Sequence, residues 1–319
     1  MSNATTRRGL IRGFIAALLG GFSTRPGLAL PPTAPRDLLG DFRRSQSFER
    51  SYRADAAIIF CGVTIFTKRG VGGAHAAVET GACGKDAGLE LRFAAGSDPA
   101  LCAGLNRFGI LEEAVIESGS APRFAFAGLI TESKEEDLES AKRALRGSAR
   151  QQVKLARGSA WNGRVQTWTE DVTLTQPFTW RESAELLTEL AAEPPRTLAR
   201  ESTAGARPFL SAMRRAALCP EPLSRQPFLH AGKLYSLELR RRAGGEHGGE
   251  RGGLIRDERG AKAAEFRVWY PAGDGSGLPV RIEYRAKPYL RLVFEADGKI
   301  AASAIASIIS RSVFSKEVA

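Results

Sequence analysis

The chain has little of what most catalytic sites are built from. Only three histidines occur among 319 residues, His75, His230 and His247, and they stand far apart. No H-x-x-x-H or H-E-x-x-H pattern brings two of them onto one helix face, so the sequence predicts no zinc site. A G-x-S-x-G motif, which marks the nucleophile of many serine hydrolases, is also missing. We therefore predict no metal, no cofactor and no catalytic residue.

Cysteine is scarce as well, with four residues, Cys61, Cys83, Cys102 and Cys219. No two form a C-x-x-C pair, so neither a zinc site nor a thioredoxin-type redox motif is indicated. Cys83 and Cys102 flank a predicted strand, Leu89 to Phe93, and are the first pair to consider for one disulfide in an oxidising compartment. Four separate thiols are the alternative.

No apolar run is long enough to span a membrane as a helix, which needs roughly 20 residues. The run Gly13–Phe22 has about half that length. It follows Arg7 and Arg8 and precedes Gly27-Leu28-Ala29, a small-apolar-small site typical of signal peptidase cleavage. This layout is that of an export signal, and the paired arginines resemble a bacterial twin-arginine signal.

This signal predicts the organisation of the chain. We expect a signal peptide over residues 1–29, cleaved after Ala29, then a linker over 30–47 and one β-rich domain over 48–319. The domain is expected to be soluble in the periplasm or another exported compartment, with the twin-arginine export machinery as a partner. The general secretory route and a basic disordered tail are the alternatives for the N-terminal stretch.

The net charge is +11, and removing the four arginines of residues 1–29 leaves +7. This excess is compatible with attraction to anionic lipid or polysaccharide. The basic residues are dispersed and accompany no nucleic-acid-binding motif, so nucleic acid is not an expected partner.

Short segments of alternating polarity dominate the chain and predict strands. They cover residues 52–66, 89–93, 109–117, 124–131, 151–157, 164–174, 234–242, 263–270, 278–285 and 289–296. Apolar residues at three- and four-residue spacing predict helices after Ser133 and Thr179, over 207–218 and over 299–314. The expected fold is mainly β, a curved antiparallel sheet or partly open β-barrel or sandwich, with two or three inserted helices and a C-terminal helix.

A glycine-rich segment, Gly70-Val71-Gly72-Gly73, interrupts the first predicted strands. No clear helix follows it, so a phosphate-binding loop is not predicted. A strand turn or a bulge explains these glycines better.

Two segments resemble the ends of an uncharacterised family of exported bacterial proteins, known only as a domain of unknown function. Tyr52–Gly73 is similar to that family's opening strands. Phe266–Tyr270 followed by Leu278–Tyr284, with its Pro-Val-Arg step, is similar to the closing strands. The resemblance implies a large curved antiparallel sheet or barrel in the cell envelope and implies no catalytic residue.

Carboxylates are the remaining candidates for chemistry. Glu112 and Glu113 are adjacent and could be imagined as a general acid and base. Glu170 and Asp171 stand near Trp161 and Trp168, a combination found in sugar-binding grooves. A structural use of such tryptophans is the alternative, since aromatic side chains serve most often in cores.

Two functions of different class follow from these patterns. The first is a non-enzymatic envelope protein that binds an apolar ligand or lipid in a barrel-like cavity. The second is an exported carbohydrate-active hydrolase or sugar-binding protein that uses carboxylates near Trp168. An apolar cavity without paired acids would favour the first, and a groove lined by tryptophan and two acids would favour the second.

Overall fold

Fourteen strands and two helices form the part of the chain that the computed structural model describes, residues 35–60, 62–97, 108–118, 122–132, 151–161, 164–174, 205–219, 225–241 and 249–296. The first seven strands are β1 (Arg43–Phe60), β2 (Val63–Cys83), β3 (Asp86–Ser97), β4 (Phe108–Glu117), β5 (Arg123–Glu132), β6 (Gln151–Trp161) and β7 (Arg164–Leu174). The others are β8 (Arg207–Pro208), β9 (Gln226–His230), β10 (Lys233–Arg241), β11 (Glu250–Asp257), β12 (Lys262–Trp269), β13 (Arg281–Lys287) and β14 (Leu290–Ala296). The helices are α2 (Pro35–Leu39) and α5 (Phe209–Leu218).

All fourteen strands belong to one sheet, in the order β7-β6-β5-β4-β3-β2-β1-β14-β13-β12-β11-β10-β9-β8. Most neighbours in the sheet are also neighbours in sequence and pair antiparallel, as expected where short turns connect alternating segments. Of these strands, only the short β8 runs parallel to its neighbour. Two meanders, β1–β7 and β8–β14, are joined where β1 pairs with β14. The prediction of a mainly β, curved and open antiparallel sheet is confirmed.

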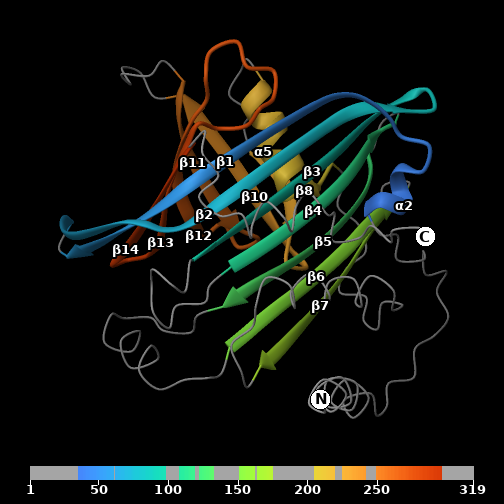
Figure 1. Cartoon of the computed structure of the whole chain (residues 1–319). Helices are drawn as coiled ribbons and strands as arrows, with labels where there is room; N and C mark the ends of the chain where they lie inside the picture. The colour runs from blue at the N-terminus through green and yellow to red at the C-terminus, as the bar shows by residue number, and fades with distance from the viewer. Residues whose placement is uncertain are drawn as a thin grey trace, which may run out of the picture. The chain divides into compact units, whose positions relative to one another are not determined.

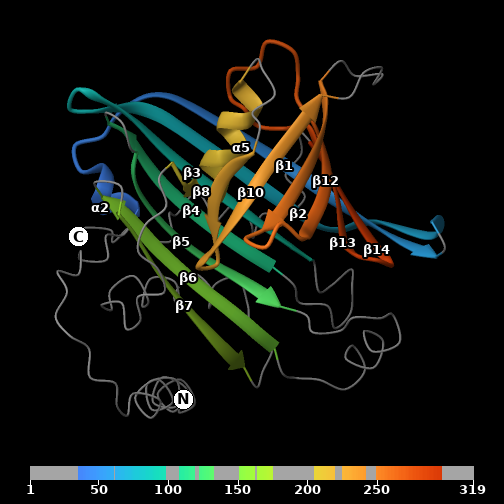
Figure 2. The same ribbon diagram turned by 180° about the vertical axis from the view of Figure 1, so that it is seen from behind.

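The sheet curls around α5, which lies against its concave face (Figures 1 and 2). One apolar cluster joins inward-facing side chains of β1–β7, such as Val78 and Phe124, to Leu229 of β9. A second cluster joins Ala212 and Ala216 of α5 to strands β9–β12. Because successive strand residues point to opposite faces, each strand contributes every second residue to this interior. The core therefore lies inside the curl of the sheet, where α5 packs against the concave face.

The outward face of the C-terminal meander is charged. Arg281 donates to Glu295 at 2.7 Å and to Glu283 at 2.6 Å, and Arg53 donates to Glu295 at 3.2 Å. Arg267 also donates to Glu283 from the next strand. Cross-strand pairs of opposite charge stabilise neighbouring strands, so this face suits solvent rather than a second apolar layer.

A β-bulge interrupts the pairing of β1 with β2, as the glycine-rich segment predicts. The register shifts between the pairs Ala54–Gly72 and Ala56–Lys68. Gly70 adopts φ +63°, a left-handed conformation that favours glycine. Its N–H donates to the Asp55 carboxylate at 2.7 Å. Beyond the bulge, toward the hairpin turn, β2 pairs with β1 alone among the described residues, while β1 still pairs with β14 as far as Ile58.

The expected linker over residues 30–47 is corrected by the structure. Residues 35–39 form α2, and β1 begins at Arg43, ahead of the expected domain start at residue 48. Leu39, together with Leu38 and Phe42, packs against Ala114 and Ile116. These contacts join residues far apart in sequence, which explains why local composition did not reveal them.

The helix expected over 207–218 is confirmed as α5, with Arg207 and Pro208 forming β8. The signal peptide and the helices expected after Ser133 and Thr179 and over 299–314 lie outside the described residues and stay predictions. In the described part of the chain, no helix is long and apolar enough to cross a bilayer.

Candidate functional site

Helix α5 is held inside the sheet by a buried carboxylate at its N-terminus. Its N-cap residue, Pro208, provides no side-chain hydrogen bond. The side chain of Glu113 in β4 caps the helix instead. It accepts hydrogen bonds from the backbone N–H groups of Leu210 at 2.7 Å and Ser211 at 2.8 Å. These are donors that a helix end otherwise leaves without an intrahelical partner. Burial raises the pKa of Glu113 to about 8, although both N–H groups oppose the shift.

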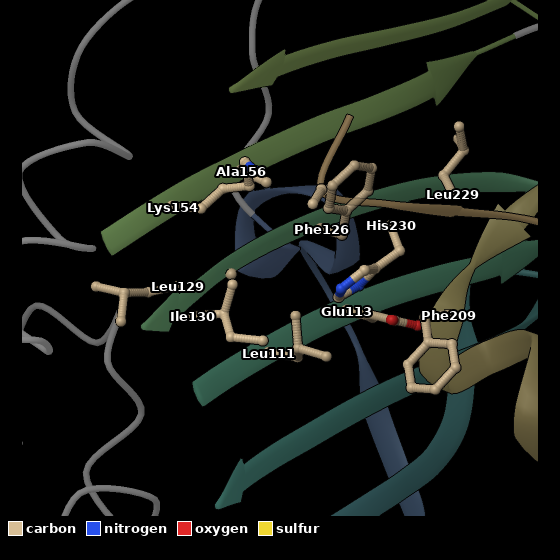
Figure 3. A pocket seen from close by; sticks show the side chains of 12 residues that line it. Leu111, Glu113, Phe126, Leu129, Ile130, Lys154, Ala156, Phe209, Leu229 and His230 are labelled. Atoms are coloured by element: carbon tan, nitrogen blue, oxygen red, sulfur yellow. The ribbon is translucent and has the colours of Figure 1, made fainter. Parts of the chain in front are cut away.

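A narrow apolar pocket lies beside Glu113 (Figure 3). Strands β4, β5 and β6 form one wall, and the other comes from Phe209 of α5 and from β9 with its turn. Burial and the nearby Lys154 ammonium lower the pKa of His230, which lines the pocket. The free space is about 20 Å³, enough for about one water molecule. The pocket therefore does not hold a lipid chain, and its carboxylate is occupied in capping α5.

A wider groove runs along another face of the same helix. Ser211 of α5 lines the groove, with Arg214 and Arg215 three and four residues after it and then Leu218. Arg207 of β8 and Cys219 lie at the two ends of this helix and line the groove as well. Leu89 of β3 and Glu117 of β4 line the groove as well. Its volume is about 320 Å³, which reaches the lower range of small-molecule sites.

Charge in this groove is mostly positive. Arg207 is buried and binds the Glu117 carboxylate with two guanidinium nitrogens, one of them at 2.7 Å. This pairing lowers the pKa of Glu117. The Arg214 Nε donates to the Ser276 carbonyl at 2.9 Å, which fixes the loop before β13. Arg215 is exposed, so its guanidinium is accessible to an anion in the groove.

Ser211 adds to the groove a hydroxyl group that makes no hydrogen bond within the described structure. Its side chain is 1% exposed, and its Oγ has no hydrogen-bond partner among the described residues. Buried hydroxyls without a partner are rare and costly, and each needs an explanation. A ligand atom in the groove would provide that partner. Arginines, an unpartnered hydroxyl and two leucines together suit a molecule with an anionic head and an apolar part.

The acidic pairs of the sequence do not form catalytic pairs. Glu112 and Glu113 are consecutive in β4, so their side chains point to opposite faces of the sheet. The same holds for Glu170 and Asp171 in β7. A glycoside hydrolase needs its two carboxylates in one cleft, where they flank the scissile bond, and side chains on opposite faces of a sheet do not share a cleft.

Trp161 and Trp168 are both in contact with arginine side chains. Trp168 is buried, and the Arg157 guanidinium lies over its ring at 5.0 Å. Trp161 is 41% exposed, but Arg123 lies 4.6 Å from its ring centroid. Each of these two rings therefore has a guanidinium group over one face.

The remaining predicted site residues are scattered. The Cys83 thiol donates to the Leu39 carbonyl at 2.8 Å, and Cys102 lies outside the described residues, so their pairing stays a prediction. His75 shares a 2.9 Å hydrogen bond with Ser51. Arg7, Arg8, Ala29 and His247 lie outside the described residues. Within the residues that the structure describes, no group of three metal-ligating side chains comes together.

The chain matches no family model, and no curated protein matches it either. Among solved structures, it is similar to a beta-barrel-like protein of Domain of Unknown Function DUF1849 from Brucella abortus. The identity is 9%, the match covers 78% of this chain and 95% of that chain, and the TM-score is 0.40. At this identity and TM-score, the neighbour assigns no residue role and no activity to the present chain.

Proposed function

We propose that the protein is an exported, non-catalytic binding protein of the cell envelope that holds an anionic amphiphile in the groove along α5. The observation that carries this proposal is the lining of the groove. Leu89 and Leu218 offer apolar surface, Arg214 and Arg215 offer positive charge, and the buried Ser211 hydroxyl lacks a partner in the described structure. A fatty acid or an alkyl phosphate has the matching chemistry.

Export is the part of this proposal that rests on the sequence. Arg7 and Arg8, the apolar run and the Ala29 cleavage site support delivery to the periplasm through the twin-arginine machinery. Binding in the envelope then fits the ligand, because amphiphiles with anionic heads are abundant there.

The amphiphile proposal replaces the simpler hypothesis of an apolar ligand in an open barrel. Helix α5 fills the concave face, and the apolar pocket beside Glu113 has room for about one water molecule. The groove is larger but carries three arginines. Arg207 is paired with Glu117, and Arg214 donates to the Ser276 carbonyl. An apolar molecule without a charged head would desolvate the exposed Arg215 guanidinium without compensation.

Native mass spectrometry of protein recovered from the periplasm of cells that express the full chain tests the proposal. Organic extraction then identifies any bound molecule. We expect a co-purifying acyl compound with a carboxylate or phosphate head, and a mass that corresponds to cleavage after Ala29. Protein that carries nothing and binds neither fatty acids nor alkyl phosphates when these are added would contradict the proposed function.

Cys219 gives a site-specific readout, because its thiol lines the groove. Alkylation of Cys219, followed by peptide mass spectrometry, should slow when dodecyl phosphate is added. Arg215→Gln should weaken this protection about tenfold, since a charge-assisted hydrogen bond contributes about 1.5–3 kcal/mol. Arg259→Gln, at an exposed turn between β11 and β12, is the matched control and should bind as wild type.

Inorganic phosphate and dodecanol separate the two parts of the ligand. If inorganic phosphate protects Cys219 as well as dodecyl phosphate does, the groove binds anions and the apolar part contributes nothing. If dodecanol protects equally well, the arginines do not select the head group. Either result would overturn the amphiphile proposal.

A further inference from the structure

The end of the β1–β2 hairpin exposes large apolar side chains. Phe60, Val63, Ile65 and Phe66, which we call the hairpin tip, are 67%, 64%, 61% and 57% exposed. Scattered apolar residues on a surface are ordinary, but a contiguous group of this size marks an interaction site. Since Ile65 and Phe66 are consecutive in β2, the tip is apolar on both faces of the ribbon.

The hairpin tip projects beyond the neighbouring strands. Strand β1 pairs with β14 only as far as Ile58, and the Ile59 N–H donates to the Tyr289 carbonyl. On its other side, β2 pairs with β3 only from Gly72 onwards. Figure 1 shows the two blue strands reaching past the rest of the sheet, and Figure 2 shows the same projection from behind. The tip is therefore presented outward as a narrow ribbon.

Basic residues lie beside the hairpin tip and just behind it. Lys68 and Arg69 come directly after it in β2 and are exposed. Arg285 lies in β13, and Arg291 of β14 donates to the Thr64 hydroxyl at 3.3 Å. No acidic residue occurs over 56–78 or 284–294. We call Lys68, Arg69, Arg285 and Arg291 the basic collar. Tyr284, 36% exposed, belongs to the same end of the sheet.

We propose that the hairpin tip inserts into the surface of an anionic lipid bilayer while the basic collar contacts the head groups. Five residues separate Val63 from Lys68, about 17 Å along an extended strand. This length is close to the roughly 15 Å half-thickness of the hydrocarbon core. Aromatic residues beside the collar suit the membrane interface, where an apolar ring and a polar group are both satisfied. The tip is thus a wedge that docks on a membrane without spanning it.

Charge argues for a lipid surface over a second copy of the chain. Two copies that met through their tips would bring two basic collars together, and the chain as a whole carries +11. Repulsion between like charges opposes such a contact. Anionic head groups instead attract each Lys or Arg near the surface by about 1 kcal/mol.

Vesicle flotation with the purified full-chain product tests this docking. We expect binding to vesicles of equal parts phosphatidylglycerol and phosphatidylcholine at low salt, and much weaker binding to pure phosphatidylcholine. Val63→Ser combined with Phe66→Ser should lower binding at least about tenfold, because two buried apolar side chains are lost. Lys68→Gln and Arg69→Gln should each lower it about fivefold, and high salt should imitate their loss.

Trp161→Ser is the matched control, since this side chain is similarly large and 41% exposed but lies in β6, five strands from β1. It should bind vesicles as wild type. Circular dichroism of each variant verifies that it is folded. Arg215→Gln in the α5 groove should also leave vesicle binding unchanged, which separates this proposal from the proposed function.

Quenching of tryptophan fluorescence by lipids measures directly whether the hairpin tip lies inside the bilayer. A tryptophan introduced by Phe66→Trp should be quenched by bilayer lipids brominated on their acyl chains. Absence of binding to the anionic vesicles, or equal binding by the double serine variant, would overturn the proposal. A third result would also overturn it: a protein that does not bind vesicles but forms a concentration-dependent dimer, which the double serine variant does not form. The tip would then dock on a second copy of the chain.

Discussion

Apolar side chains gather in two places of this molecule, and only one of them is covered. Inside the curl, Phe228 is 1% exposed and lies between the rings of Phe209 at 5.3 Å and Tyr235 at 5.5 Å. At the hairpin tip, Phe66 is 57% exposed. Burial of apolar area drives folding, so the first group explains how the sheet holds its curl. The second contributes little to folding, which is why we assign it to an external contact.

Phe228→Ala should have the largest effect on stability. The side chain fills space between α5 and β10, and its removal should lower the free energy of unfolding by about 3–5 kcal/mol. Urea denaturation followed by circular dichroism measures this. If the free energy of unfolding fell by less than about 1 kcal/mol, neighbouring side chains would have filled the cavity. The interior would then not be tightly packed, and it would differ less from the exposed hairpin tip.

Glu113 makes the stability of the interior depend on pH. Burial raises its pKa from 4.5 to about 8, so between these values the folded protein holds a proton that the unfolded chain releases. Its contribution is therefore fully present below about pH 4.5 and is lost as the pH rises to about 8. The slope should be on the order of 1 kcal/mol per pH unit.

Glu113→Gln isolates this contribution. Leu210 and Ser211 donate to different oxygens of the Glu113 carboxylate, so the amide oxygen of Gln keeps one of these two bonds, and the variant is less stable at every pH. The amide does not titrate in this range. The free energy of unfolding of the wild type minus that of the variant should decrease from pH 4.5 to pH 8. His230, whose pKa is lowered by burial, titrates in both proteins and cancels in the difference. A difference independent of pH would show that Glu113 stays ionised when folded.

Local sequence patterns predicted many of the strands, because side-chain alternation and turn residues act over a few positions. They missed β9 and β11, and the segment expected over 52–66 runs across the turn between β1 and β2. The segments expected over 263–270 and 289–296 match β12 and β14, and the helix over 207–218 matches α5. The linker expected over 30–47 was wrong, since α2 packs against β4 and the start of β1 pairs with the end of β2, and no local pattern encodes these contacts.

The candidate site was less accessible to sequence reasoning. The spacing of Arg207, Ser211, Arg214 and Leu218 on one face of a predicted helix was a visible signal that could have marked a groove. That this face meets Glu117 depends on how the whole sheet curls, which sequence periodicity does not determine. Alternation along β4 could have separated Glu112 from Glu113, but capping of a helix almost 100 positions away in the chain could not be foreseen.

Phe66→Ala should have the smallest effect on stability and is the counterpart of Phe228→Ala. Surface substitutions away from caps, cores and strained backbone usually change the free energy of unfolding by less than about 0.5 kcal/mol. The same urea denaturation should therefore give an unchanged midpoint and an unchanged slope. A loss above about 1 kcal/mol would mean that another part of the chain covers this ring in the folded protein. The hairpin tip would then belong to the core, and the argument for its docking on a membrane would fail.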